Sequence, residues 1–256
     1  MSIYEQILFA VDDSIATITF NQPDVMNLWS AVMENEVRAA IADAVASAQV
    51  AAIVLTGAGR GFCAGADLRP GAKPVQLELG PGEHRFSFLE NCAKPLVAAI
   101  NGPAAGVGLS IALYCDFRYM AEGTKLTTAF ARRGLIAEHG SAWLLPRLIG
   151  LQDALEMLIG GGVVTTAEAA SMRLVRALPA EDFLPSAIAR TRALVGESSP
   201  RSMRVIKRQV HDALTQSLVE AVADANREQA ESVKSEDCRE GIAAFRERRV
   251  ADFTGH

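Results

Sequence analysis

Two stretches rich in glycine and alanine constrain the fold of this chain most, because each follows directly on an apolar run. Residues 57–68 (GAGRGFCAGADL) follow the run at 51–55, and residues 100–110 (INGPAAGVGLS) follow the run that begins at Pro95. Both runs are typical of buried strands. A backbone with so few side chains can approach a ligand closely and offer it N–H groups, which suit an oxygen that gains negative charge during a reaction. The pattern predicts two loops that each direct one N–H at the same oxygen.

The composition is that of an ordinary globular protein. Of 256 residues, 50% are apolar and 21% are charged, which is enough apolar material for a large core. The formal net charge of −5 gives no support for nucleic acid as a partner. No apolar run approaches the length of a bilayer span, so we expect no membrane partner either.

The cysteines and histidines form no metal-binding pattern. No two cysteines make a CxxC pair and the histidines are scattered, so we expect no bound metal. We interpret the cysteines as reduced thiols of a cytoplasmic protein. The N-terminus, MSIYEQILFAVDD, lacks the basic start and apolar segment of a signal peptide, which favours the same compartment. The four cysteines are Cys63, Cys92, Cys115 and Cys238.

Strands and helices are predicted to alternate over the first half of the chain. Apolar residues alternate with polar ones at both ends of Asp12-Asp13-Ser14, which is typical of a hairpin, and Ser30 is a suitable helix cap. Residues 69–82 hold three prolines and three glycines and are predicted to form a mobile loop over the site. The recurrence of strand, glycine-rich loop and helix predicts an α/β fold of stacked ββα units. The expected strands are 3–11, 15–20, 51–55, 95–100 and 117–120, and the expected helices are 30–48, 83–92 and 106–114.

The chain is predicted to be almost entirely helical from Gly140 onward. Ser199 is expected to cap a new helix with Pro200 at its first position. The helices that follow carry apolar stripes but too little apolar material for a core of their own, so we expect them to pack on a second subunit. The predicted division is a core at 1–197 and a helical oligomerisation region at 198–256.

Several stretches resemble the enoyl-CoA hydratase/isomerase (crotonase) superfamily. AAIVLTGAGRGFCAGADL and PLVAAINGPAAGVGLSIALYCDFRYMAE are similar to its two glycine-rich motifs. ATITFNQPDVMNLWS resembles its N-terminal hairpin and adenine-side turn, and EGIAAFRERRVADF resembles its terminal helix. The resemblance implies a crotonase-like spiral of ββα units with a C-terminal helical trimerisation region, assembled as a homotrimer or a dimer of trimers. It also implies an acyl-CoA substrate, with coenzyme A as part of the substrate and no separate cofactor.

The resemblance further implies that two backbone N–H groups hold the thioester carbonyl and stabilise an enolate. The matching positions are Ala66 and Val107. Because the donors belong to the main chain, a valine at the second position is acceptable. The alternative is that both stretches are only tight turns.

The chain departs from the family's hydratases at both of their glutamates. The two positions align to Ser110 and Phe130, and neither residue can act unaided as an acid or base at neutral pH. One acid remains nearby, Glu138, where several isomerases of the family carry their acting carboxylate. Leu135 and Trp143, with Ile136 and Ala137, are expected to surround Glu138 with a poorly hydrated pocket that prepares it for proton transfer. Alternatively, Glu138 only favours the positive end of a helix that begins at Gly140.

The remaining site residues follow from the resemblance, except His84, which is chosen for its place in the helix predicted after the mobile loop. His84 is expected to face the acyl pocket, and the terminal helix of a neighbouring subunit is expected to bring Phe245 and a basic residue to the coenzyme. Arg249, Arg69 and Lys73 are alternatives to Arg248 for the charge that meets the 3′-phosphate. The expected acyl pocket is His84, Ser110, Phe130, Leu135 and Trp143, and the expected CoA-binding residues are Val25, Met26, Cys63, Ala64, Leu68, Phe245 and Arg248.

These features favour isomerisation of an enoyl-CoA double bond, since one base can take a proton from one carbon and return it to another. Three alternatives stay open. They are hydration of an enoyl-CoA with Glu138 alone positioning water, binding of acyl-CoA without catalysis, and hydrolysis of a thioester or cleavage of a β-keto carbon–carbon bond.

Overall fold

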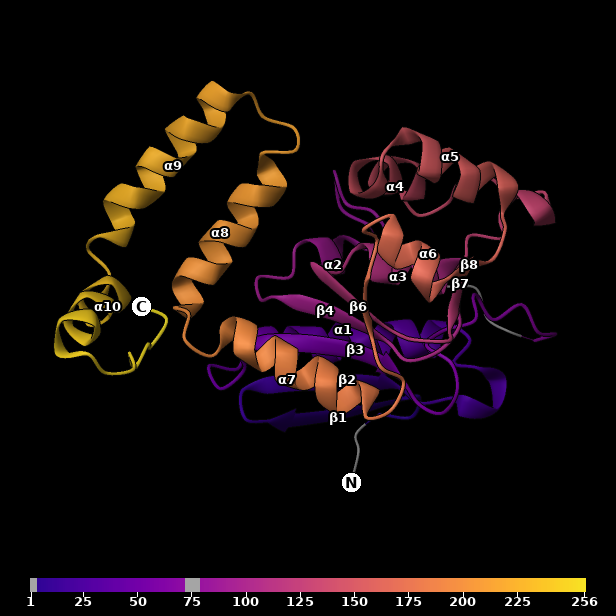
Figure 1. The fold of residues 1–256 in the computed structure, drawn as a ribbon, viewed down its shortest axis with the longest axis horizontal. Helices are drawn as coiled ribbons and strands as arrows, with labels where there is room; N and C mark the ends of the chain where they lie inside the picture. Colours follow the sequence, from indigo (N-terminus) through magenta and orange to yellow (C-terminus); the bar gives the residue numbers. More distant parts are fainter. Residues whose placement is uncertain (1–3, 72–78) are drawn as a thin grey trace.

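A six-stranded sheet forms the centre of the molecule in the computed structural model, which describes residues 4–71 and 79–256 (Figure 1). Its order is β1-β2-β3-β4-β6-β9. The β1 and β2 strands are antiparallel, and the other neighbours are parallel. The six strands are β1 Ile7–Asp12, β2 Ile15–Phe20, β3 Ala52–Gly57, β4 Leu96–Ile100, β6 Phe117–Ala121 and β9 Arg176–Leu178.

The predicted N-terminal hairpin is confirmed from Ile7 onward, with Ile7 opposite Phe20 and Asp12 opposite Ile15. Its turn contains no glycine. Asp13 and Ser14 instead both adopt the left-handed region, with φ of 42° and 65°, the geometry that matches the twist of two-residue hairpins. Residue 3, where we expected the first strand to begin, lies outside the described residues.

Helices cover both faces of the sheet. On one face, α1 packs against β1 and β2 and α3 packs against β4, over a core that includes Ile53, Leu55 and Ile100. On the other face, α7 packs against β3 and β4, whose Val54 and Val97 are buried there. Ser30 caps α1 as predicted, since its hydroxyl accepts a hydrogen bond from Met33 N. A second, three-stranded sheet consists of β5 Ala104–Ala105, β7 Lys125–Thr127 and β8 Val164–Thr165. The helices here are α1 Ala31–Ala46, α2 Ser87–Glu90, α3 Val107–Leu113, α4 Ser141–Ile149, α5 Leu151–Gly160, α6 Thr166–Ser171 and α7 Phe183–Val195, with 3-10 turns η1 Pro23–Val25 and η2 Ala131–Arg133.

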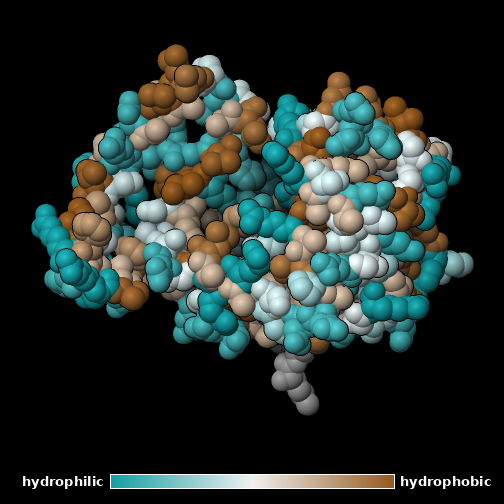
Figure 2. Space-filling view, viewed as in Figure 1, coloured by the Kyte–Doolittle hydropathy of each residue, from teal (hydrophilic) through white to brown (hydrophobic). Residues whose placement is uncertain are grey.

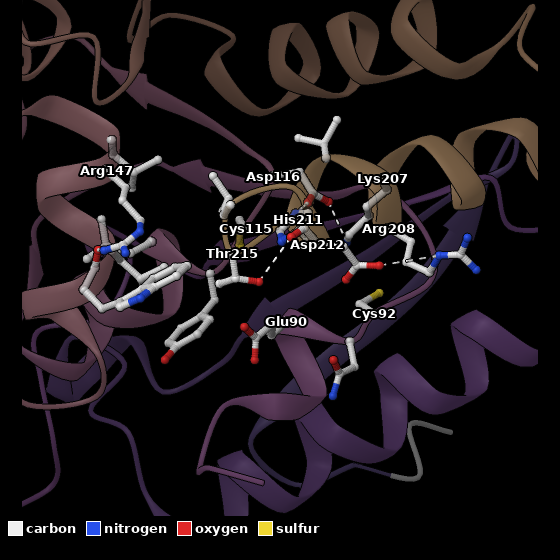
Figure 3. A pocket seen from close by; sticks show the side chains of 18 of the residues that line it. Glu90, Cys92, Cys115, Asp116, Arg147, Lys207, Arg208, His211, Asp212 and Thr215 are labelled. Carbon is white, nitrogen blue, oxygen red and sulfur yellow. Dashed lines mark hydrogen bonds and ion pairs between the residues drawn. The ribbon is translucent and has the colours of Figure 1, made fainter. Parts of the chain in front are cut away.

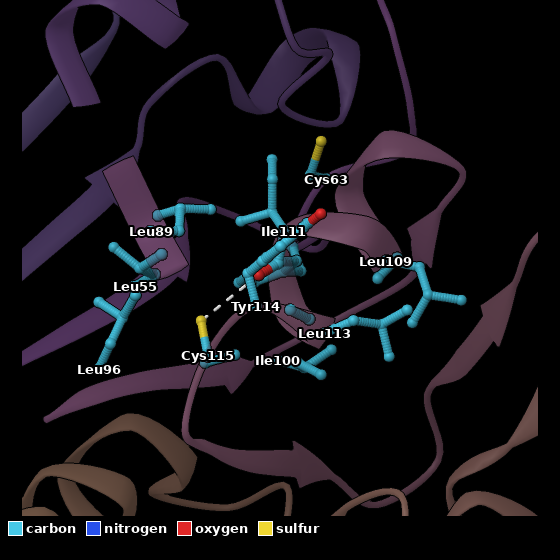
Figure 4. Close-up of a cluster of buried hydrophobic side chains, with 14 of the residues drawn as sticks. Leu55, Cys63, Leu89, Leu96, Ile100, Leu109, Ile111, Leu113, Tyr114 and Cys115 are labelled. Atoms are coloured by element: carbon cyan, nitrogen blue, oxygen red, sulfur yellow. Dashed lines mark hydrogen bonds between the residues drawn. The ribbon is translucent and has the colours of Figure 1, made fainter. Parts of the chain in front are cut away.

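All seven residues of α3 are buried. Figure 4 shows Leu55 and Leu96 from the sheet beside Ile111, with Leu113 and Ile100 below it. A helix enclosed in this way has little freedom to shift, because protein interiors are close-packed. The start of α3 is therefore held in a fixed position relative to the ends of β3 and β4.

Two secondary-structure predictions are wrong. The helix expected at 83–92 is reduced to α2 because the preceding turn is stabilised by side chains, with Ser87 Oγ accepting from His84 N and His84 Nδ1 accepting from Phe86 N. The region after Gly140 also contains β8 and β9, which we did not expect. These strands have only two and three residues, too few for an alternating pattern to show.

Helices α8 Pro200–Asp212, α9 Leu218–Ser232 and α10 Glu236–Glu247 extend away from the sheet as an arm (Figure 1). Ser199 caps α8 as predicted, with its Oγ accepting from Ser202 N at 3.0 Å. Apolar side chains lie on the surface of the arm, where Figure 2 shows brown patches. Even so, none of the helices in the described ranges is both long enough and apolar enough to cross a membrane.

Candidate active site

The two glycine-rich stretches lie side by side. Cys63 forms a bridge with Ala104, in which Cys63 N donates to Pro103 O at 3.3 Å and Ala105 N donates to Cys63 O at 3.0 Å. A Cβ on Gly108 would clash with the Cys63 carbonyl oxygen. The close approach of the first loop to the start of α3 therefore requires glycine at this position.

Trp29 sets the orientation of the peptide at Ala66. Trp29 N donates to Gly65 O at 2.8 Å, and Asp67 N donates to Trp29 O at 3.1 Å. Both bonds lie on the Trp29 side of the strand, so the Ala66 N–H points away from it. In the part of the chain that the structure describes, the Ala66 N–H has no hydrogen-bond acceptor, and Ala66 is exposed.

Val107 is the first residue of α3, and its N–H has no acceptor within the helix because of that position. Gly106 precedes it with φ of 51°, a left-handed conformation that glycine adopts most readily. The Val107 side chain is buried and anchors the start of the helix. Among the described residues the N–H groups of Ala66 and Val107 are thus unengaged, and that they meet at one oxygen stays a prediction.

Ser110 and Phe130, which we predicted to occupy the positions of two glutamates, lie beside the start of α3. Ser110 is buried, and its hydroxyl donates to Gly106 O at 3.2 Å. Phe130 is also buried, with its ring edge 4.0 Å from where a Cβ on Gly106 would lie. Neither side chain brings a carboxylate to this place.

Glu138 lies in the turn before α4. Its carbonyl oxygen accepts from Ser141 N at 3.0 Å and Ser141 Oγ at 2.7 Å, which fixes the backbone of the turn. Its carboxylate is 40% exposed and lies 3.9 Å from His139 Nε2. Among the described residues no N–H of α4 donates to that carboxylate, so Glu138 does not cap the helix through its side chain.

The expected apolar enclosure of Glu138 is not formed. Leu135 is 45% exposed, Ile136 80% and Trp143 38%. After η2, Gly134 adopts a left-handed conformation with φ of 71°, and the segment that follows runs along the surface of the chain. The prediction was wrong because an apolar composition does not say which side chains a turn directs inward.

His139 lies between Glu138 and the interior. Its ring meets the Phe86 ring edge-on at a centroid distance of 5.2 Å, and 19% of its side chain is exposed. Burial lowers the pKa of His139, and the nearby Arg85 lowers it further. Because the ordinary value is about 6.5, His139 is neutral at pH 7 and can accept or donate one hydrogen bond at each ring nitrogen.

A cavity of about 600 Å³ adjoins His139 and is rich in ring side chains. His84 stacks on Tyr114 at a centroid distance of 5.4 Å, and Glu90 holds His84 through a 2.7 Å contact. Burial and, secondarily, Glu90 raise the pKa of Tyr114 to about 12, so its hydroxyl keeps its proton. The lining residues are Gly82, His84, Arg85, Phe86, Glu90, Tyr114, His139, Gly140, Trp143 and Leu144.

The predicted acyl pocket is only partly assembled. His84 and Trp143 line this cavity together, as expected. Ser110 and Phe130 do not, because both are packed in the core against the start of α3. Leu135 does not line it either, because it lies in the exposed turn after η2.

A second cavity of about 670 Å³ lies between the sheet and α8 and was not predicted (Figure 3). Asp116 is at its base, where it accepts from Lys207 Nζ at 2.7 Å, His211 Nε2 at 3.1 Å and Leu96 N at 2.7 Å. Glu90 and Trp143 line both cavities, so the two adjoin. No group of three histidine, cysteine or acidic side chains in the described residues is arranged to hold a metal ion.

Some of the residues assigned to the CoA adenine and pantetheine lie next to one another, and one does not fit its assignment. Ala64 N donates to Met26 O at 3.0 Å, which places the loop beside Val25, and Leu68 is 80% exposed. The prediction that Cys63 binds the coenzyme is wrong. Its side chain is fully buried and its backbone N–H and C=O both bond to the second loop, so it presents nothing to a ligand. Burial raises the pKa of its thiol to about 12.

The residues expected on the terminal helix, and the alternatives for the 3′-phosphate, differ in exposure and in the ion pairs that they already form. Phe245 is 85% exposed on α10, which lies beside the start of α8 and away from α3 (Figure 1), and Arg248 follows that helix. Arg69 is bound by both carboxylate oxygens of Asp67, at 2.9 and 2.8 Å, and Arg249 is paired with Glu240. The last alternative, Lys73, lies outside the described residues.

The sequence analysis did not identify a buried charge cluster around Glu34, which contacts the Ala66 loop through Trp29. Glu34 is fully buried and accepts from Trp29 Nε1 at 2.8 Å, from Arg38 at 3.0 Å and from Arg85 at 2.9 and 2.7 Å. A signal was present, because Glu34 shares a helix face with the buried Val37, three residues on. An acid on the apolar face of a helix requires buried partners.

Comparisons with known proteins agree over nearly the whole chain. Residues 10–256 match the sequence profile of the family described as enoyl-CoA hydratase/isomerase. The chain is 37% identical to a probable enoyl-CoA hydratase from Rhodobacter capsulatus (98% of this chain, 99% of that one) and 30% identical to the 1,2-epoxyphenylacetyl-CoA isomerase of Escherichia coli (98% and 99%). The crystal structure of an enoyl-CoA hydratase from Mycobacterium tuberculosis superposes with a TM-score of 0.91 at 27% identity (98% and 99%).

Proposed function

The chain belongs to the enoyl-CoA hydratase/isomerase family, and from this premise we propose that it moves a double bond within an enoyl-CoA thioester. The Ala66 and Val107 N–H groups are the proposed donors to the thioester oxygen, and Glu138 is the proposed base. Coenzyme A enters as part of the substrate, and the reaction requires no separate cofactor.

Two observations support this proposal together: the N–H groups of Ala66 and Val107 are unengaged, and the sequence carries few acids at the positions expected for catalysis. Ser110 and Phe130 stand where paired carboxylates would add water, and Glu138 is the acid that remains in this part of the sequence. A single carboxylate is sufficient for isomerisation because the proton that it removes is the proton that it returns.

In the proposed reaction, Glu138 takes a proton from the α-carbon of a 3-enoyl-CoA. The electron pair moves into the thioester, and the negative oxygen is stabilised by the N–H groups of Ala66 and Val107. Protonated Glu138 then returns the proton to the γ-carbon, which leaves the double bond conjugated with the thioester. Proton transfer by a positioned group contributes about 10²–10⁴-fold to a rate, and one donor of this kind about 10²–10³-fold.

The test is Glu138→Gln, which keeps the size of the side chain and removes the base. With a 3-enoyl-CoA as substrate, we expect the formation of the conjugated thioester, followed by its absorbance, to slow about 10²–10⁴-fold. Binding of a saturated acyl-CoA and the melting temperature should not change. Glu156→Gln, which changes an exposed carboxylate of α5 that lines neither cavity, is the matched control and should keep most of the activity. Unchanged turnover in Glu138→Gln would rule the base out.

Hydration of a 2-enoyl-CoA is the second candidate, because a carboxylate that is 40% exposed has water within reach. Addition of water that depends on Glu138 would favour it. Tight acyl-CoA binding without any turnover would instead indicate a binding protein, and release of a free acid or a cleaved ketone would indicate a hydrolase. All of these outcomes can be read from the same incubations.

We further propose that residues 198–256 join subunits in a homotrimer or a dimer of trimers. Support comes from apolar side chains on α9 and α10 that are largely exposed in the single chain, such as Val219 at 79% and Phe245 at 85%. In such an assembly, Phe245 and Arg248 meet the coenzyme bound to a neighbouring subunit. The free cysteines support a reducing compartment, the cytoplasm.

A further inference from the structure

Glu34 connects two parts of the site that are far apart in the sequence. One of its oxygens, Oε2, accepts both from the Trp29 indole and from the Arg85 guanidinium, and the other accepts from Arg38. A fully buried carboxylate is stable only when its hydrogen bonds are complete. Glu34 therefore constrains where Trp29 and Arg85 can lie relative to each other.

We propose that Glu34 is a positioning residue that orients the Ala66 N–H through Trp29. The backbone of Trp29 bonds to Gly65 and Asp67 on both sides of Ala66, and the indole of the same residue is held by Glu34. The path from the buried carboxylate to the proposed donor thus passes through one residue. This inference rests on the proposed function, in which Ala66 donates to the thioester oxygen.

The Arg85 bonds extend the constraint to the ring-lined cavity. Arg85 lines that cavity, with its guanidinium 5.3 Å from the centre of the Phe86 ring, while two of its nitrogens bond to Glu34. Arg38 donates to the Arg85 carbonyl oxygen and lies 4.0 Å from the centre of the Phe88 ring. Glu34 therefore holds the cavity wall and the Ala66 loop as one unit.

Such a unit matters because donors in a site of this kind act only in the right geometry. A displacement of about 1 Å from the productive position can lower a rate about 10²-fold. The Trp29 ring packs edge-on against Phe20 at a centroid distance of 5.4 Å. The bond from its Nε1 to Glu34 adds a directional restraint to this packing.

The experiment measures the thioester carbonyl directly. Butanoyl-CoA labelled with ¹³C at the thioester carbon is bound to the full-length protein, and the carbonyl stretch is recorded by isotope-edited infrared spectroscopy. Donors at the oxygen lower this frequency. We expect Trp29→Phe, which keeps an aromatic ring but removes the indole N–H, to lose at least half of the lowering seen in the wild type. We expect kcat to fall about 10–100-fold with KM changed less than threefold.

Thr191→Val is the matched control. Thr191 is fully buried on α7, on the other face of the sheet, and its hydroxyl donates to Ala187 O at 2.8 Å. This variant should lose stability and keep the carbonyl frequency. Glu34→Leu with Arg85→Leu removes the acceptor of the indole N–H together with the Arg85 guanidinium, while Arg38 keeps its bond to the carbonyl oxygen of residue 85, and this variant should give the same frequency shift as Trp29→Phe. If the double variant does not fold, Trp29→Phe alone decides, because it leaves the Glu34 ion pairs in place.

The outcomes distinguish the positioning role of Glu34 from the proposed Ala66 and Val107 donors. A wild-type frequency that is lowered, and equally lowered in Trp29→Phe with unchanged kcat, overturns the role of Glu34 and leaves the Ala66 and Val107 donors intact. A wild-type frequency equal to that of free butanoyl-CoA overturns the proposed donors, and the inference with them.

Discussion

At the scale of single residues, the spacing of the two loops depends on one missing methyl group. Gly108 faces the Cys63 carbonyl so closely that a Cβ would clash with backbone. The Cys63 backbone cannot easily move away from Gly108, because its N–H and C=O are both hydrogen-bonded to the second loop. The geometry of the proposed donors is therefore sensitive to substitutions that add no polar group.

We expect Gly108→Ala to push the Cys63 loop away from α3. The melting temperature should fall, and kcat should fall about 10-fold or more, since the Ala66 and Val107 amides no longer converge. Gly160→Ala is the control, because no atom lies within 4 Å of the added methyl and alanine favours a helix by up to about 1 kcal/mol. Equal effects of the two substitutions in thermal melts and initial-rate assays would contradict this reasoning.

His139 is expected to make stability depend on pH. Burial, and then Arg85, lower its pKa in the folded protein, whereas the unfolded value is about 6.5. Between these two values the unfolded chain binds more protons, so the free energy of unfolding falls as the pH drops below about 6.5. His139→Gln should flatten this part of the profile in denaturant titrations from pH 5 to 8. A profile with the same slope in both proteins would contradict the assignment.

At the scale of elements, two helices connect the site to the rest of the molecule. The start of α3 carries Val107, and Asp116, shortly after its end, binds both Lys207 and His211 of α8. Burial alone would raise the pKa of Asp116, but His211, Lys207 and the Leu96 N–H together outweigh it, so the net shift is downward. Asp116 is therefore charged at neutral pH and holds the arm to the sheet.

We expect Asp116→Asn to release α8. The loss in free energy of unfolding is about 3 kcal/mol, because Lys207 and His211 lose the carboxylate between them. Hydrogen exchange over 200–212 should accelerate at pH 7. The wild type should lose this contribution only in acid, as the pH falls below about 3.9 and through the lower folded value. Lys234→Ala breaks an exposed pair with Glu231 and should change little. Identical exchange in Asp116→Asn and wild type would show that the arm is held by other contacts.

At the scale of the whole molecule, the arm exposes more apolar surface than a single chain requires. Val219 is 79% exposed on α9, and Phe245 and Val250 are exposed beyond it. Patches of this kind mark contact surfaces more often than free ones. The sheet, by contrast, has a core on each face, to which α8 adds the partly buried Met203.

We expect Val219→Glu to dissociate the assembly, because it places a charge in an apolar interface. Sedimentation velocity should show the wild type at three or six times the chain mass and the variant at the mass of one chain, with an unchanged circular dichroism spectrum. Gln229→Glu adds the same charge to the exposed surface of the same helix and should leave the assembly intact. A monomeric wild type would disprove the oligomer.

Local patterns in the sequence were sufficient for most of the fold. Apolar alternation placed β1 and β2, the runs before the glycine-rich stretches placed β3 and β4, and Ser30 and Ser199 marked the starts of α1 and α8. The glycines also marked the two loops, because a close backbone approach excludes larger residues wherever it occurs. Such signals depend on neighbours along the chain, and the sequence contains them directly.

The tertiary structure alone decided which distant residues meet. Arg85 is 51 residues from Glu34, and His211 is 95 from Asp116, and no periodicity links either pair. The same limit explains why Cys63 was assigned to a ligand and proved buried, and why the turn at Glu138 proved open. Burial of a side chain is settled by whatever packs over it, and in this chain those partners arrive from other elements.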